Sequence, residues 1–84
     1  MSLFDQQCIK AIDLILLSED WGGAHKIVQG IDSPVAQWIH AVLHKIEGDE
    51  SNSRYWYNQS MLEAYETHNN SQHELQAIKE KILG

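Results

Sequence analysis

The chain has 84 residues, a length that favours one domain with a single modest core. Hydrophobic residues make up 43% of it, which argues against intrinsic disorder, and no apolar run is long enough to span a membrane. The net charge is −6 and the six Lys and Arg residues are scattered, so we expect no nucleic-acid or membrane partner. Cys8 is the single cysteine and has no partner for an internal disulfide. Since no leader pattern is visible either, we expect a cytoplasmic protein.

Hydrophobic periodicity predicts an all-α fold for residues 1–84, with about five short helices separated by brief breaks. The first helix, residues 3–17, is apolar almost all round, so we expect it to contact neighbours on more than one side. A second helix follows a capping aspartate and covers residues 20–29. Its Trp21 is expected in the core, and Gly22-Gly23 predicts close packing against another backbone.

The third predicted helix has the clearest start in the chain. Ser33 or Asp32 can cap it, and Pro34 suits its first turn, where the missing N–H costs nothing. The helix runs to Glu47 and is stopped by Gly48. One stripe of it is expected in the core, formed by Val35, Trp38, Ile39, Val42 and Ile46.

A fourth helix is expected from Asp49, with apolar residues spread over a wide arc: Tyr55, Trp56, Tyr57, Met61, Leu62 and Tyr65. Three consecutive aromatic residues point in different directions, so at least one ring is exposed, and Tyr55 and Tyr57 are candidate interface residues. After a polar break, Ser71 and Glu74 predict a capping box that starts a last amphipathic helix.

A faint internal repeat relates the first two predicted helices to the next two. The corresponding positions, 29 residues apart, are Leu14, Leu17, Asp20 and Ala24 in one unit and Leu43, Ile46, Asp49 and Ser53 in the other. Each unit is a helix, an acidic turn and a helix with a small residue one turn in, as in tetratricopeptide and Sel1-like repeats. We therefore expect antiparallel helical hairpins, with a C-terminal capping helix over the exposed end.

Three potential metal ligands on the third helix, His40, His44 and Glu47, point in one direction. At about 100° per residue they fall within roughly 60° of one another. If the helix pairs stack, His25 approaches them, with Gln29 beside it. Two imidazoles one turn apart can chelate a divalent ion, and a carboxylate can complete the set. From sequence alone we favour hydrogen bonds between helices, or plain surface, for these residues.

A complete catalytic set is missing. Cys8 lies in the most apolar helix and is expected in the core, and a small helical domain has little room for an acid–base pocket. His68 and His73 flank the polar break and are expected to be solvated. The sequence therefore favours a protein that is not an enzyme.

Residues 21–60 resemble a small bacterial protein family of uncharacterised function. The similar positions are Ala24-His25, Gln29, Trp38-Ile39-His40-Ala41, Leu43-His44, Glu47-Gly48-Asp49, Asn52 and Tyr55-Trp56-Tyr57. Lys45 and Ser53 are mild departures from the family pattern. The resemblance implies no reaction. It implies that one polar set belongs together, as a buried network or a binding site: His25, His40, His44, Glu47, Asp49 and Asn52.

Two functional hypotheses follow from the sequence. We favour a non-catalytic helical-repeat-like module without a cofactor that binds another protein or itself, since wide apolar faces are typical of homodimers. The alternative is a domain that binds a divalent metal ion or a small ligand; an enzyme is one version of this alternative. The binding residues would be His25, His40, His44 and Glu47.

Overall fold

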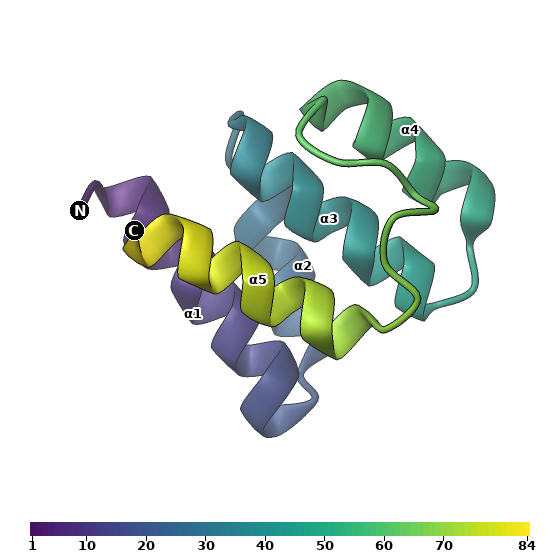
Figure 1. Ribbon diagram of the computed structural model, residues 1–84. Coiled ribbons are helices and arrows are strands. Elements are labelled where there is room, and N and C mark those ends of the chain that lie inside the picture. Colours follow the sequence, from purple (N-terminus) through teal and green to yellow (C-terminus); the bar gives the residue numbers. More distant parts are fainter.

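The computed structural model describes residues 1–84 as five α-helices without a β-strand, which confirms the all-α prediction (Figure 1). The helices are α1 Leu3–Ser18, α2 Trp21–Gln29, α3 Pro34–Ile46, α4 Glu50–Ser60 and α5 Ser71–Leu83. None of them combines the length and the apolar character that a bilayer crossing requires.

The helix starts follow the local rules of capping. Asp20 Oδ1 accepts a hydrogen bond from the N–H of Gly23, and Ser33 Oγ accepts one from Ala36, so each side chain satisfies an N–H group that the helix leaves free. Pro34 occupies the first turn of α3, as predicted. These contacts fix where α2 and α3 begin.

The helices pack as two successive pairs joined through their middle members. α1 packs against α2, α3 against α4, and α2 against α3. α5 lies across α1 and α3, whereas the backbone of α4 packs closely only against that of α3 (Figure 1). α5 therefore does not cover the exposed end of the second pair, where a capping helix was expected. Its buried residues instead contact the surface that α1 and α3 share, and an ion pair of 2.8 Å joins Lys79 Nζ to Asp13 of α1.

The turns inside the two pairs have similar backbone dihedral angles. Glu19 and Gly48 both adopt positive φ, 51° and 80°. The residues that follow them, Asp20 and Asp49, have φ/ψ of −89°/76° and −93°/77°, and each carboxylate accepts an N–H three residues later. The closing hydrogen bonds differ, since Asp20 N–H donates to the carbonyl six residues earlier and Asp49 N–H to the one five residues earlier. The offset of 29 thus relates two similar turns, while a tetratricopeptide-like arrangement of the helices stays a prediction.

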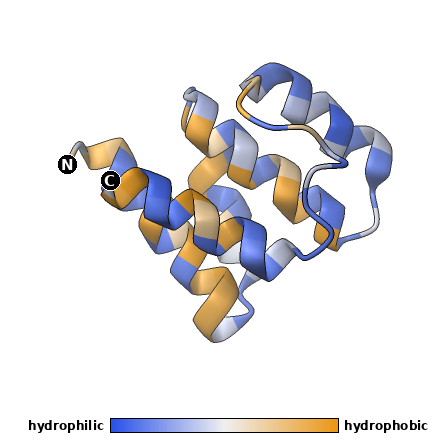
Figure 2. Ribbon diagram, viewed as in Figure 1, coloured by the Kyte–Doolittle hydropathy of each residue, from blue (hydrophilic) through white to orange (hydrophobic).

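The core forms mainly between α1 and α3, α2 and α5 each add two buried apolar residues to it, and α3 is the most enclosed helix. Figure 2 shows apolar residues concentrated in α1 and α3, whereas α4 is largely hydrophilic. Cys8 is buried as expected, and burial raises the pKa of its thiol to about 11. Trp21 was expected in the core but is 41% exposed. The buried residues of α2 are Ala24 and Val28, one and two helical turns after Trp21. Trp21 itself is the first residue of the helix and lies at the edge of the core.

A buried polar cluster fastens α5 to α3 and α4. The carboxylate of Glu74, which is fully buried, accepts hydrogen bonds from Trp38 Nε1 at 2.8 Å, the Tyr57 hydroxyl at 2.5 Å and Lys45 Nζ at 3.2 Å. The predicted capping box at Ser71 is therefore wrong, because Glu74 is engaged by these donors. Asn70 caps α5 in its place.

Two further expectations differ from the structure. Gly22 and Gly23 face no neighbouring backbone; a Cβ on Gly22 would meet nothing within 4 Å, and one on Gly23 would collide with the capping carboxylate of Asp20. The fourth helix ends at Ser60, where Met61 adopts a left-handed conformation with φ 61°. Tyr65 therefore belongs to the connection before α5, not to α4.

Candidate functional site

Three imidazoles from two neighbouring helices meet on one side of the molecule. His40 and His44 are one helical turn apart on α3, so the helical period places them on one face. His25 reaches them from α2, which packs against α3. One potential ligand nitrogen from each residue lies within 4.8 Å of the other two. These three residues are called the histidine cluster below.

The cluster is held together by contacts between rings. The His40 and His44 imidazoles stack with centroids 5.0 Å apart and planes at 20°. His25 is nearly perpendicular to both, with centroids at 4.6 Å from His40 and 5.7 Å from His44. Trp56 of α4 stacks on His40 at 4.1 Å. The tertiary structure thus brings α2, α3 and α4 together at this point.

His40 is kept in its neutral form near neutral pH. Its side chain is buried, and burial lowers its pKa to about 4, with smaller contributions from the charges of His25 and His44. A neutral imidazole has a free lone pair on one nitrogen, which is the form that binds metal ions. His40 is therefore ready to act as a ligand without first losing a proton.

His44 has an unusual environment. Its Nδ1 is buried and has no hydrogen-bond partner, and it lies 3.7 Å from both Glu47 Oε1 and Asp49 Oδ2. Asp49 is in turn held by Asn52 Nδ2, which donates to it at 2.7 Å; this bond is the main reason that the pKa of Asp49 is lowered. Carboxylates beside the far nitrogen of an imidazole are the outer partners that orient metal-binding histidines.

A hollow of about 430 Å³ opens over the cluster and is lined by Trp21, Gly22, His25, His44 and Glu47. Two of the three imidazoles therefore face a space that a solute can enter. Trp21 and Gly22 were assigned to packing from the sequence, and the structure places them at this opening instead.

The remaining predicted site residues are divided by the fold. Gln29 is exposed and lines a second hollow, about 290 Å³, together with His40, Tyr55 and Trp56. Tyr55 is 51% exposed, which fits a candidate interface residue. Tyr57 was expected to share that role, but it is buried because its hydroxyl reaches Glu74.

Sequence reasoning missed two polar roles. Trp56 was assigned to the core, and nothing local indicates that it stacks on His40. Lys45 was treated as a mild family departure, yet it is nearly buried and also donates to the carbonyls of Tyr65 and His68 at 2.7 and 2.9 Å. Its spacing of seven residues from Trp38 places both on one face of α3, a signal that could have identified it.

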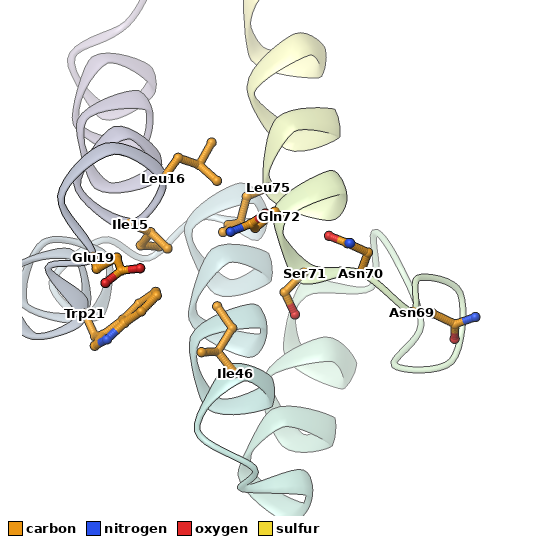
Figure 3. A pocket seen from close by; sticks show the side chains of 10 residues that line it. All are labelled: Ile15, Leu16, Glu19, Trp21, Ile46, Asn69, Asn70, Ser71, Gln72 and Leu75. Carbon is orange, nitrogen blue, oxygen red and sulfur yellow. The ribbon is translucent and has the colours of Figure 1, made fainter.

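A third hollow, about 350 Å³, lies between the ends of α1 and α3 and the start of α5 (Figure 3). Trp21 and Ile15 line it from the α1–α2 side, Ile46 from α3, and Gln72 and Leu75 from α5. Trp21 thus lines both this hollow and the one over the histidine cluster. This third hollow is called the Trp21 groove below.

The chain matches no family model, no curated protein and no solved structure. The resemblance of residues 21–60 to a bacterial family therefore stays an expectation from the residues themselves. What the fold and the site define is a class: a small all-α domain with a cluster of three histidines at the junction of three helices.

Proposed function

We propose that this chain is a helical module that binds one divalent transition metal ion through His25, His40 and His44. The observation that carries the proposal is the convergence of three imidazole nitrogens within 4.8 Å of one another. Imidazole suits zinc, copper, nickel and iron, and three of these ligands are enough for a site of substantial affinity.

The electrostatics of the cluster support this function. His40 is neutral near pH 7, so the ion does not compete with a proton there. The buried Nδ1 of His44 has no partner, and an ion on its Nε2 would favour a proton on Nδ1 that Glu47 or Asp49 can accept after a small movement. Metal binding would thus satisfy a polar atom that the metal-free protein leaves unpaired.

Capture of the ion requires the rings to converge. Zinc–nitrogen bonds of about 2.0–2.1 Å in a tetrahedral site hold the nitrogens about 3.3 Å apart. The largest nitrogen separation here is 4.8 Å. His25 is half-buried, and the His40 and His44 rings are stacked, so all three imidazoles must rotate to direct their lone pairs at one ion. We expect binding to rotate these side chains and to leave the backbone of α3 unchanged.

The test is a titration of metal-free protein, purified without a histidine tag, with Co²⁺ and Zn²⁺. We expect one ion per chain and the intense visible absorption of tetrahedral Co²⁺. His25→Ala and His44→Ala should each weaken binding by more than about tenfold, since loss of even an outer partner costs that much. His73→Ala is the matched control, because His73 is exposed on α5 and lies outside the cluster.

Two results would overturn the proposal. One is the absence of stoichiometric binding at millimolar Co²⁺ and Zn²⁺ in folded protein. The other is binding that His25→Ala and His73→Ala weaken equally, since this would describe adventitious surface coordination. Circular dichroism of each variant establishes that the helices are retained.

A second candidate function is protein binding, including self-association, at the Trp21 groove. The observation that favours it is the 41% exposure of Trp21 beside Ile46, which is 36% exposed, because exposed aromatic residues often anchor interfaces. Light scattering over a range of concentrations tests self-association. We expect Trp21→Ser to reduce it and Leu83→Ser, at an exposed apolar residue near the end of α5 outside the groove, to leave it unchanged. A strict monomer at high concentration would contradict self-association.

A further inference from the structure

We infer that the metal centre at His25, His40 and His44 keeps one coordination position open to the hollow beside Trp21 and Gly22, and that this position takes a small monodentate anion. The inference rests on the proposed metal binding and goes beyond it, since a protein can bind an ion in a closed, purely structural site. Closed sites use four protein ligands, whereas sites that bind exogenous molecules use three.

The surroundings of the cluster offer few candidates for a fourth protein ligand. On the α4 side, the Trp56 ring stacks on His40 and has no metal-binding atom to offer. Asp49 is engaged with Asn52 and caps α4. Asp32 lines a hollow together with His40 but accepts a hydrogen bond from Gln37 at 3.4 Å. Glu47 therefore remains as the carboxylate near the cluster to which no hydrogen bond is assigned.

Glu47 is placed to serve the imidazole of His44 rather than the ion. Its Oε1 lies 3.7 Å from Nδ1 of His44. The two nitrogens of an imidazole ring point in diverging directions, so a carboxylate next to Nδ1 is remote from an ion on Nε2. This arrangement assigns Glu47 to the outer shell and leaves the fourth position for a solute.

The hollow provides both room and access. Its volume of about 430 Å³ exceeds that of any small anion, and His25 and His44 both line it. Gly22 contributes no side chain to its wall, and a Cβ built there would meet nothing within 4 Å. A solute can therefore approach the half-buried imidazoles of His25 and His44 from this side without a movement of the backbone.

Charge determines which solutes fit. Three neutral imidazoles leave the full 2+ charge of the ion uncompensated, so an anion is favoured over a neutral donor. The carboxylates of Glu47 and Asp49 repel a large polyanion but are too few to cancel the attraction at the metal itself. The geometry therefore points to small monodentate anions, such as azide, or to hydroxide formed from a metal-bound water.

The test uses the Co²⁺-loaded protein and sodium azide as the probe. We expect azide to change the visible spectrum of bound Co²⁺ in a saturable manner, without releasing the ion. Gly22→Leu should place a bulky side chain in the hollow and weaken azide binding at least tenfold while Co²⁺ binding is retained. Gln6→Leu, at an exposed uncharged position on α1 that does not line this hollow, is the matched control and should leave azide binding unchanged.

The possible failures are distinct. If Co²⁺ binds and azide leaves its spectrum unchanged at 100-fold excess over the protein and at millimolar concentration, the site is closed and the inference is wrong. If Glu47→Gln then admits azide, Glu47 is the fourth ligand. If Co²⁺ does not bind, the proposed function itself fails. Equal azide binding in the wild type and in Gly22→Leu would show that the anion enters from elsewhere, which also overturns the inference.

Discussion

The Trp56 indole lies on the His40 imidazole, with ring centroids 4.1 Å apart and ring planes 17° apart. His40 also stacks on His44, so a polar side chain in the middle of α3 is only 5% exposed. Aromatic stacking is the contact that allows an imidazole to be buried here. Because burial disfavours its charged form, the same contact makes the stability of the domain sensitive to acid.

The metal-free protein should lose stability as the pH falls from about 6.5 to about 4. Unfolded histidine titrates near pH 6.5, whereas His40 in the folded chain titrates at about 4, so the unfolded state binds more protons between these values. The part of the unfolding free energy that depends on neutral His40 is fully present above pH 6.5, and its complete loss at low pH amounts to at most about 3 kcal/mol. Urea unfolding in EDTA at pH 7, 5.5 and 4.5 measures the decline.

A variant separates this effect from the titration of the carboxylates, including Glu47 and Asp49 near the cluster. His40→Phe retains a ring that can stack on Trp56 but removes the titrating group. We expect a shallower decline of stability over the same pH range, although His25 and His44 remain. An identical pH dependence in wild type and variant would show that His40 does not carry the effect.

The carboxylate of Glu74 should be the most sensitive single position in the fold. Glu74→Ala leaves the Lys45 ammonium without its charged partner and the Trp38 N–H without its acceptor, and breaking a buried ion pair from one side costs about 3–5 kcal/mol. The double variant Lys45→Met with Glu74→Leu removes both charges and should lose less. Urea midpoints measure both; a double variant that is less stable than Glu74→Ala would contradict this account.

Two neighbouring glycines should respond differently to alanine. Gly22→Ala meets nothing and improves helix propensity, so we expect a gain of about 0.5–1 kcal/mol. Gly23→Ala displaces the Asp20 carboxylate from its capping position, and the loss of about 1 kcal/mol cancels that gain. In an Asp20→Ala background, Gly23→Ala should become stabilising. Thermal melts of the four variants provide the comparison, and equal gains at both glycines in the wild-type background would refute it.

Tyr55 and Tyr57, two residues apart on α4, should also differ in how much their hydroxyl groups contribute to stability. Tyr57→Phe removes a hydroxyl that donates to the buried Glu74 carboxylate, and hydrogen bonds to charged groups are worth about 1.5–3 kcal/mol. Tyr55→Phe alters an exposed ring and should change stability by less than about 0.5 kcal/mol. Denaturant unfolding of both variants tests this difference. Similar losses at both positions would mean that the Tyr57 hydroxyl contributes nothing specific.

The helix pattern was largely predictable because its signals are local. Pro34 marks the first turn of α3, Asp20 caps α2, and the spacing of His40 and His44 is a property of any α-helix. The approach of His25 to that pair was also expected, but its distance was not. It depends on how α2 packs against α3, and no periodicity contains that information.

The errors occurred where long-range contacts outweigh local preference. Glu74 has the sequence context of a capping residue, yet a buried indole, a phenol and an ammonium group engage it in the core. Trp21 has the hydrophobicity of a core residue, but it lies in the first turn of a short helix that buries only its middle. Neither the burial of Glu74 nor the exposure of Trp21 can be predicted from the residues within one or two helical turns of each.

By itself, the sequence determined an all-α domain, the main helix starts and a face of α3 with two imidazoles, because hydrophobic period and capping chemistry act over a few residues. The tertiary structure alone decided that α5 lies across α1 and α3, that Tyr57 is buried and that Trp56 stacks on His40. It also decided that His25 completes a cluster beneath an open hollow. These features depend on the packing of helices that are distant in the chain, where the burial of shared surface outweighs any local rule.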